Sequence, residues 1–298
     1  MKIINSIFYL LLLSFFITSC GEDDSTDQPK TDHSNSEVQT MTHDGIEREY
    51  MLYLPEAYDA NSPVPVLLNF HGFGDKASGF MDYTDMRSLA ETNNFILVYP
   101  QGSLEDGASH WNPCPIGGDN KSTADDVGFI EAMIEKISAE FSIDKQRIYA
   151  AGYSNGGMMA YGLANYKSEL IAAVASVSGA MLDCTNPVSH PMPVLHLHGT
   201  NDGIIPYDGG LYYTSVQKTL DHWIEINNTT TTPAMQTSND GSTEIELYIY
   251  AQGDQSVSVE HYKYLDGGHV WFSNKYDGKT TGQLIWEFVS RYDLNGLR

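Results

Sequence analysis

Basic residues are scarce in this chain. It contains 16 Lys and Arg residues against 39 Asp and Glu residues, which gives a formal net charge of -23. A field of that sign repels polyphosphates and anionic lipid surfaces, so we expect no nucleic-acid partner and favour neutral ligands or neutral polymers. Charged residues make up only 18% of the chain and apolar residues 41%, values that exclude a disordered protein.

Long apolar runs are also lacking. The longest mostly apolar stretch, residues 7–17, is shorter than the roughly 18 to 20 residues that a membrane-spanning helix needs. Lys2 precedes this stretch and two small residues follow it, a pattern typical of a secretion signal over residues 1–20. The ending Ile17-Thr18-Ser19-Cys20 resembles the bacterial lipobox. We therefore expect Cys20 to be lipidated and to become the first residue of the mature protein.

No large apolar side chain occurs in residues 21–36, which predicts a flexible acidic tether between the anchor and one domain over residues 37–298. The acidic start of this tether resembles the surface-export signal of bacterial lipoproteins. We expect a monomeric outer-membrane lipoprotein at the cell surface, attached to the membrane through its lipid only. A periplasm-facing lipoprotein is the alternative.

Cysteine is rare, with three residues in the chain. If Cys20 carries a lipid, Cys114 and Cys184 remain as an even pair in an exported protein, and we predict that they form a disulfide. Two buried free thiols are the alternative, because the sequence does not give the separation of the two Cα atoms.

Short β-rich runs alternate with amphipathic helical stretches from residue 37 onward, which predicts one α/β domain. An antiparallel hairpin over residues 37–53 is expected at the edge of a mostly parallel, twisted sheet with helices on both faces. In such a sheet the active groups lie at the carboxyl ends of the strands. The further expected strands are 64–70, 95–99, 147–151, 171–177, 193–198, 244–250 and 257–264. The expected helices are 85–92, 127–137, 156–164, 214–226 and 281–292. Residues 101–121 are expected to form a loop.

The sharpest chemical signal is Gly152-Tyr153-Ser154-Asn155-Gly156, between an expected strand and an expected helix. This arrangement is that of a nucleophile elbow, in which the flanking glycines permit a tight turn and expose the serine hydroxyl. A serine nucleophile needs a base within hydrogen-bond reach, and the base needs an orienting acid. Asp202 and His269 each follow an expected strand, and the order Ser154, Asp202, His269 is the order that α/β-hydrolases use.

Other acidic and histidine residues compete for these roles. Asp208 and Asp266 are the rivals of Asp202, and both also fit as turn residues. His196 and His198 point to the same face of one strand and suggest a metal pair. We favour polar residues at a strand end, since no third ligand has suitable spacing, and we predict no metal. The glycine-rich stretch 117–122 lacks the ending of a phosphate loop, and we reject that interpretation.

Acyl transfer also requires backbone donors for the oxyanion. His71-Gly72-Phe73-Gly74 follows a strand expected beside the elbow, so we predict that the N–H groups of Phe73 and Asn155 form the oxyanion hole. A simple strand-ending turn is the alternative interpretation of this stretch.

Together these residues resemble the polyhydroxybutyrate depolymerase-like esterases, the group shared with feruloyl and acetyl-xylan esterases of carbohydrate esterase family 1 in the α/β-hydrolase superfamily. The resemblance covers about residues 38–295. It is carried by the stretches THDGIEREYMLYLP, NFHGFGD, WNPC, DDVGFI, RIYAAGYSNGGMMAYGLA, VLHLHGTNDGIIPY and GGHVWF.

The resemblance implies a serine esterase with the triad Ser154, Asp202 and His269 and no metal or organic cofactor. It further implies that Trp111, Asn112 and Trp271 line the substrate cleft, although both tryptophans fit equally well as packing residues. We also place Tyr153, beside the nucleophile, in the substrate site. In this group a Cys beside the Trp-Asn pair is familiar, which is consistent with a link between Cys114 and Cys184.

The expected substrates are ester-bearing polymers or small esters. Feruloyl and acetyl esters of plant polysaccharide are favoured over hydroxybutyrate oligomers. A non-catalytic lipoprotein that captures polysaccharide is the alternative from another class, because a fold alone does not guarantee chemistry. A peptidase is a weaker enzyme alternative.

Overall fold

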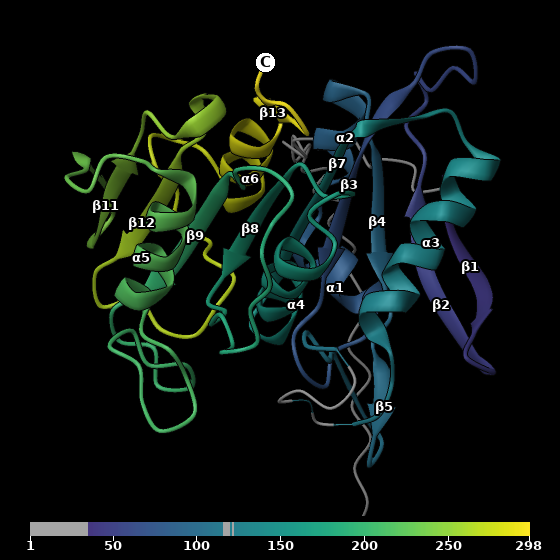
Figure 1. Ribbon diagram of the computed structural model, residues 1–298, viewed down its shortest axis with the longest axis horizontal. Helices are drawn as coiled ribbons and strands as arrows, with labels where there is room; N and C mark the ends of the chain where they lie inside the picture. The colour runs from purple at the N-terminus through teal and green to yellow at the C-terminus, as the bar shows by residue number, and fades with distance from the viewer. Residues whose placement is uncertain (1–34, 116–119, 121) are drawn as a thin grey trace, which may run out of the picture. The chain divides into compact units, whose positions relative to one another are not determined.

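The computed structural model describes residues 35–115, 120 and 122–298 (Figure 1). The expected signal segment with Cys20, the expected tether up to residue 34, and most of the glycine-rich stretch 117–122 lie outside the described residues. Among the helices of the described part, none has the length and apolar character needed to cross a membrane.

One ten-stranded sheet organises the described residues. Its central strands β4, β3, β7, β8, β9 and β12 run parallel, and an antiparallel pair closes each edge. Across the sheet the order is β1 (Ser36–His43), β2 (Ile46–Tyr53), β4 (Ile96–Pro100), β3 (Val64–Phe70), β7 (Ile143–Tyr153), β8 (Ala173–Val177), β9 (Val194–Gly199), β12 (Val259–Tyr264), β11 (Thr243–Tyr250) and β10 (Ala234–Asp240). The predicted α/β class with an antiparallel edge hairpin is confirmed.

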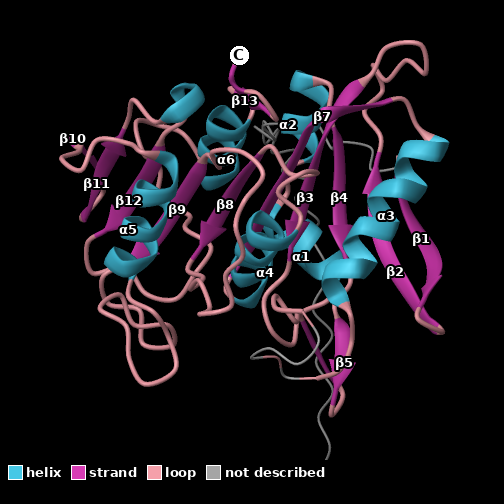
Figure 2. Cartoon of the chain, in the orientation of Figure 1, coloured by secondary structure: helices cyan, strands magenta, loops and turns pink. Residues whose placement is uncertain are grey.

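Helices cover both faces of this sheet (Figure 2). Helices α3 (Asp126–Glu140), α4 (Asn155–Tyr166) and α5 (Val216–Asn227) pack on one face. Helices α1 (Ala77–Thr84), α2 (Arg87–Asn93) and α6 (Thr281–Val289) pack on the other. Side chains of β3 alternate between the two cores, with Leu68 in the first and Leu67 in the second, as the twofold period of a strand requires.

Several elements differ from the expectation. The segment 101–121 is not only a loop, because β5 (Ser103–Glu105) and β6 (Ala108–His110) form a small antiparallel ribbon within it. Helix α1 and strand β10 were not expected, since α1 is short with no side-chain cap and β10 is mostly exposed and polar. The final expected helix ends at Val289, and the chain continues as the short pair β13 (Tyr292–Asp293) and β14 (Gly296–Leu297). A 3-10 turn, η1 (Asp254–Ser256), precedes β12.

The carboxyl ends of the parallel strands lie at one edge of the sheet, toward which the arrows of β4 and β8 point in Figure 1. Ser154, Asp202 and His269 follow β7, β9 and β12 at this edge. Strands β9 and β12 are adjacent and in parallel register from Val194↔Val259 to Gly199↔Tyr264, so the loops carrying the acid and the base leave the sheet side by side.

Candidate active site

Ser154 lies between β7 and α4 with φ of 55° and ψ of -120°. Positive φ is rare for a residue with a Cβ, and such strained turns concentrate at functional sites. The backbone N–H of Ser154 donates to the Val177 carbonyl at the end of β8, 2.8 Å away. The neighbouring strand therefore holds the turn that presents the serine hydroxyl.

The glycines around this turn are required by the closeness of the backbone. A Cβ on Gly156 would lie 2.0 Å from the Phe70 carbonyl oxygen, and a Cβ on Gly152 would lie 2.3 Å from the Gly156 carbonyl oxygen. No side chain fits at such distances, so the glycines of the sequence motif let α4 start directly against β3.

His269 links the serine to the acid. Its Nε2 lies 2.8 Å from Ser154 Oγ, and its Nδ1 lies 2.8 Å from Asp202 Oδ2. Because a carboxylate accepts only, Nδ1 carries a proton and donates, and Nε2 of the neutral ring is then free to accept the serine proton. The structure thus brings the three predicted residues into one hydrogen-bonded row.

Asp202 is buried and receives several hydrogen bonds. Its Oδ1 accepts from the N–H groups of Ile204 and Ile205 at 2.9 and 2.8 Å, while Oδ2 faces His269 and His198. Burial raises the pKa of the Asp202 carboxyl, but the hydrogen bonds from His198, His269 and the two backbone amides outweigh it and hold that pKa well below its ordinary value. The acid is therefore ionised and can stabilise a protonated His269.

The rival acids do not reach the base. Asp208 and Asp266 are exposed, and Asp266 adopts a positive φ of 56° in the turn before His269. The backbone N–H of Asp266 donates to Thr200 Oγ1, and the N–H of Asn201 donates to the Gly267 carbonyl. These bonds tie the acid loop to the base loop and give Asp266 a turn role.

His71 organises the turn that contains Phe73. It is buried, its Nδ1–H donates to the Gly72 carbonyl at 2.7 Å, and its Nε2 accepts from the Gly102 N–H at 3.0 Å. Burial lowers the pKa of His71 to about 4, so the ring stays neutral and keeps one donor and one acceptor. The Gly74 N–H next to Phe73 donates to the Ser109 carbonyl. Sequence reasoning missed this role of His71, although its place before Gly72 was a signal.

Asn155 opens α4, where the first N–H groups of a helix have no partner within the helix and the dipole favours negative charge. With Phe73 it remains our predicted pair of oxyanion donors, since Phe73 follows β3 and Asn155 follows β7, the strand paired with β3. The side chain of Asn155 is directed away from this role, because it bonds the backbone of Trp111.

The expectation that Trp111 and Asn112 line a cleft is wrong. Trp111 is 1% exposed and packs edge-on against Phe70, while its Nε1–H donates to the His71 carbonyl. Asn112 is fully buried and its Nδ2 group donates to Ser122 Oγ and the Ala124 carbonyl. These two side chains have no surface with which to contact a substrate, and they shape the loop from within.

Trp271 is also mostly a packing residue, with 8% of its surface exposed and its ring edge-on to Phe80. Tyr153 is half-buried, and its hydroxyl donates to the His269 carbonyl at 2.9 Å while its ring lies 5.2 Å from the imidazole. Tyr153 therefore holds the base in place, in addition to the substrate contact that we predict for it.

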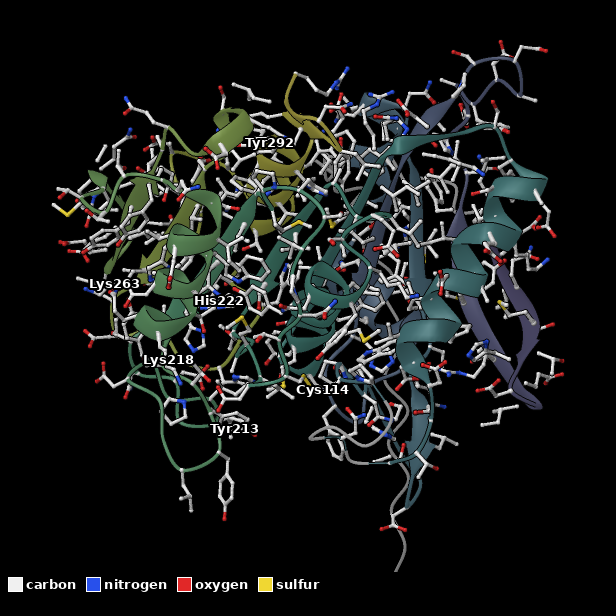
Figure 3. All side chains as sticks on the ribbon, in the orientation of Figure 1. Cys114, Tyr213, Lys218, His222, Lys263 and Tyr292 are labelled. Atoms are coloured by element: carbon white, nitrogen blue, oxygen red, sulfur yellow. A yellow bond between two sulfur atoms is a disulfide. The ribbon has the colours of Figure 1, made fainter. Side chains whose placement is uncertain are left out.

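Cys114 and Cys184 form the predicted disulfide, with their Cα atoms 5.9 Å apart. It links the segment after β6 to the segment after β8, across 70 residues. Figure 3 shows Cys114 and Tyr213 at the lower end of the view, the end toward which β4 and β8 point. The disulfide thus ties together two loops at the carboxyl edge of the sheet.

His196 and His198 are buried, with stacked rings 5.1 Å apart, and their ring nitrogens contact each other. Within the described residues, one group has ligand atoms close enough to share a metal ion, namely His43, Asp44 and Asp125, all within 4.8 Å. Its His43 already contacts Asp125, which caps α3, so this group has a structural role at the β1–β2 hairpin.

Residues 58–246 match the phospholipase/carboxylesterase family. The chain belongs to that family. The match includes Ser154 and Asp202 and ends before His269, which the structure adds to the row.

Individual relatives of this chain are named as esterases. It is 29% identical over 253 residues to a bifunctional acetylxylan esterase/xylanase of Neocallimastix patriciarum, covering 85% of this chain and 34% of that protein. It is 25% identical over 265 residues to feruloyl esterase B of Piromyces equi, covering 83% of this chain and 46% of that protein. The chain therefore spans less than half the length of these two relatives.

Among solved structures, the fold is similar to that of an acetyl xylan esterase from Aspergillus awamori, with a TM-score of 0.63 and 17% identity over 85% of this chain and 99% of that chain. At this identity the likeness shows the α/β-hydrolase fold. The names of the two relatives above agree with the predicted resemblance to the feruloyl and acetyl-xylan esterase group.

Proposed function

We propose that this protein is a serine carboxylic-ester hydrolase that acts, as a monomer, on feruloyl or acetyl esters of plant polysaccharide. The observation that carries the proposal is the hydrogen-bonded row of Ser154, His269 and Asp202, in which a strained elbow presents the nucleophile to the base.

The geometry supports an acyl-enzyme route. His269 Nε2 takes the proton of Ser154 as Oγ attacks the ester carbonyl, and the oxyanion that forms meets the N–H groups of Phe73 and Asn155. Protonated His269, stabilised by ionised Asp202, then gives its proton to the departing alcohol. A water molecule, activated by the same base, releases the acid and restores the serine.

A small apolar cluster supports apolar acyl groups as substrates. Buried Met158, Ala180 and Ile205 pack together with partly buried Leu182 and Tyr213. The N–H of Met158 donates to the Ser154 carbonyl and that of Ile205 to Asp202, so the cluster adjoins both the nucleophile and the acid. An aromatic acid such as ferulate gains more from such a surface than acetate does.

A cavity of about 620 Å³ provides room for the polymer part of a substrate. It lies between β2, the β5–β6 ribbon and the start of the α3 segment, and it reaches Gly74 beside Phe73. Its lining includes the accessible hydroxyl residues Ser122 and Thr123, which suit the hydroxyl groups of a sugar chain.

The proposal is tested by the release of ferulic acid from methyl ferulate and of acetate from acetylated xylan. The full chain and its Ser154→Ala variant are assayed in parallel. Loss of both activities in the variant would support the serine esterase, and the ratio of the two rates would identify the preferred acyl group. If the wild type cleaves neither substrate, hydroxybutyrate oligomers are assayed next. Inactivity on those, with retained binding to xylan, would replace the enzyme by a polysaccharide-capture protein.

We further propose that residues 1–20 direct export, that Cys20 carries a lipid, and that residues 21–36 tether the catalytic domain to the outer membrane. The lipobox-like ending before Cys20 supports this. Incorporation of labelled palmitate by the wild type and its loss in Cys20→Ala would test the anchor. Protease treatment of intact cells would separate a surface location from a periplasmic one.

A further inference from the structure

Asp202 has a second imidazole partner that the reaction scheme does not use. His198 Nε2 lies 3.3 Å from Asp202 Oδ2, the same oxygen that accepts the Nδ1–H of His269 at 2.8 Å. His198 is 1% exposed, and the side chain of Asp202 is fully buried. One carboxylate oxygen is thus shared between the base and a buried histidine of β9.

The surroundings of His198 decide where its proton lies. Its Nε2 faces the Ile205 carbonyl at 2.9 Å as well as Asp202 Oδ2. Both are acceptors, so a bare nitrogen there would face two negative oxygens and Nε2 must carry the hydrogen. When Nε2 carries the only ring hydrogen, Nδ1 is an acceptor.

The donor to that nitrogen is His196. Its Nε2 lies 3.1 Å from His198 Nδ1 and must therefore carry a hydrogen, which makes the other nitrogen of His196 an acceptor. The Tyr161 hydroxyl lies 2.7 Å from His196 Nδ1 and donates to it. The hydrogen bonds consequently run in one direction, because each residue donates to the next in the series Tyr161, His196, His198, Asp202.

We propose that His198 is a positioning residue for Asp202, and that Tyr161 and His196 hold it in the tautomer that donates to the acid. This proposal goes beyond the proposed function but depends on it for any kinetic consequence. The burial of all four residues favours it, because a reversed hydrogen in a buried site would leave a donor or an acceptor unpaired.

Other titratable groups face this network. Burial, followed by the nearby His198 and His261, holds the pKa of His196 well below its ordinary value, so His196 remains the neutral donor that this series requires. The Tyr207 ring lies edge-on to His198 at 5.9 Å, and Tyr153 of β7 also interacts with Asp202. His261 of β12 contacts the His196 carbonyl through Nδ1 and makes no contact with Asp202 in the described residues.

Sharing Asp202 Oδ2 between two donors has a consequence for the base. A carboxylate that already accepts from His198 attracts the protonated form of His269 less strongly than one that accepts from His269 alone. His198 should therefore both orient the acid and weaken the attraction between the acid and protonated His269.

The first test reads the tautomers of the wild-type protein directly and uses variants only for assignment. In wild-type protein labelled with ¹⁵N-histidine, the imidazole nitrogen shifts are measured at neutral pH and assigned with single His→Gln variants. Protons on Nε2 of both His196 and His198 are expected. A proton on Nδ1 of either ring, with or without one on Nε2, would overturn the proposal whether or not the protein hydrolyses esters.

The second test compares variants by the pH dependence of kcat/KM on a soluble ester. His198→Asn is too short to reach Asp202, whereas His198→Gln places an amide donor near the position of Nε2. His261→Gln is the matched control, since it removes an equally buried imidazole from the adjacent strand at the register position of His196.

We expect His198→Asn to lower kcat by about tenfold or more with KM changed less than about twofold, and to move the acidic limb of kcat/KM to higher pH by about half a unit. His198→Gln should restore most of both values. The most downfield imidazole N–H resonance, from the bond between His269 and Asp202, should move in His198→Asn and stay in place in His261→Gln.

An unchanged acidic limb and an unchanged resonance in His198→Asn would refute the positioning role, as would an equal change in His261→Gln. If His198→Asn does not fold, Tyr161→Phe replaces it, because this variant deletes only the hydroxyl at the far end of the series. A smaller shift of the limb in the same direction is then expected. If the wild type hydrolyses no ester, the proposed function fails, while the resonance and the tautomers still decide the role of His198.

Discussion

Asn155 and Trp111 exchange two hydrogen bonds: the Trp111 N–H donates to Asn155 Oδ1 at 2.7 Å, and Asn155 Nδ2 donates to the Trp111 carbonyl at 3.0 Å. The residue after the nucleophile thus pairs, through its side chain, with the backbone that follows the β5–β6 ribbon. Both groups are buried, which strengthens each bond relative to an exposed one.

Replacing the side-chain amide of Asn155 should lower both the stability and the activity of the protein. In Asn155→Leu the Trp111 N–H and carbonyl lose their partners, which should cost about 2–4 kcal/mol of stability and lower kcat at least about tenfold. Urea unfolding and ester hydrolysis measure the two effects. Asn61→Leu, in an exposed turn, is the control, and an equal loss in both variants would argue against a special role of the pair.

The assignment of Asp202 as the acid can be tested against the two other candidate acids. Asp202→Asn removes the charge that stabilises protonated His269 and should lower kcat by about ten-thousand-fold, by analogy with other triads. Asp266→Asn and Asp208→Asn, both exposed, should keep kcat within about twofold. A large loss in Asp266→Asn with a small one in Asp202→Asn would reverse the assignment.

The glycine at the start of α4 should tolerate no side chain. A Cβ in Gly156→Ala would collide with the Phe70 carbonyl, which belongs to the rigid central sheet, so a loss of about 3 kcal/mol or more in the free energy of unfolding is expected. Gly79→Ala in α1 points into open space and should instead gain about 0.5–1 kcal/mol. Thermal unfolding of both variants would show the contrast, and similar changes in the two would refute it.

Opening the disulfide should loosen the loops at the carboxyl edge. The paired variant Cys114→Ser, Cys184→Ser should lose about 2–4 kcal/mol of stability, because a closed loop of 70 residues no longer restricts the unfolded chain. Chemical unfolding of the variant and of wild type, with and without reductant, checks this. Reductant should move the wild type toward the variant and leave the variant unchanged.

Buried histidines predict a loss of stability in mild acid. Burial lowers the pKa of His71 to about 4 and that of His261 to about 3, and it holds the pKa of His196 well below its ordinary value of 6.5. Between about pH 4 and 6.5 the unfolded chain binds these protons and the folded protein does not, so the free energy of unfolding falls as the pH falls, by about 1.4 kcal/mol per pH unit for each group.

Urea unfolding at several pH values between about 4.5 and 7, the window that this linkage defines, measures the slope. His261→Gln removes one of the three groups and should reduce the slope by about one proton. Equal slopes in this variant and in wild type would show that His261 does not contribute.

The sequence predicted the three catalytic residues better than it predicted the side chains that surround them. Ser154, Asp202 and His269 each follow an expected strand, and the order of the three residues along the chain is visible in a sequence. The burial of Trp111 was not visible, because an aromatic residue in a loop fits packing and binding equally well. The contact between His198 and Asp202 depends on how the chain turns after β9, which no local pattern records.

The same limit applied to the fold. The buried strands β3 and β4 were found from their largely apolar runs. Strand β10 was missed, because its side chains are mostly exposed and its pairing with β11 is made by the backbone. Periodicity reports burial, so an element that buries little leaves a weak signal.

The position of β12 in the sheet also bears on biosynthesis. This strand carries the loop of His269, pairs with β9 in the parallel core, and is the last of the ten to leave the ribosome. A nascent chain that has already folded its elbow and acid loop still lacks the base. The hydrogen-bonded row can therefore form only after synthesis has passed His269, and a chain that is still being made carries an incomplete site.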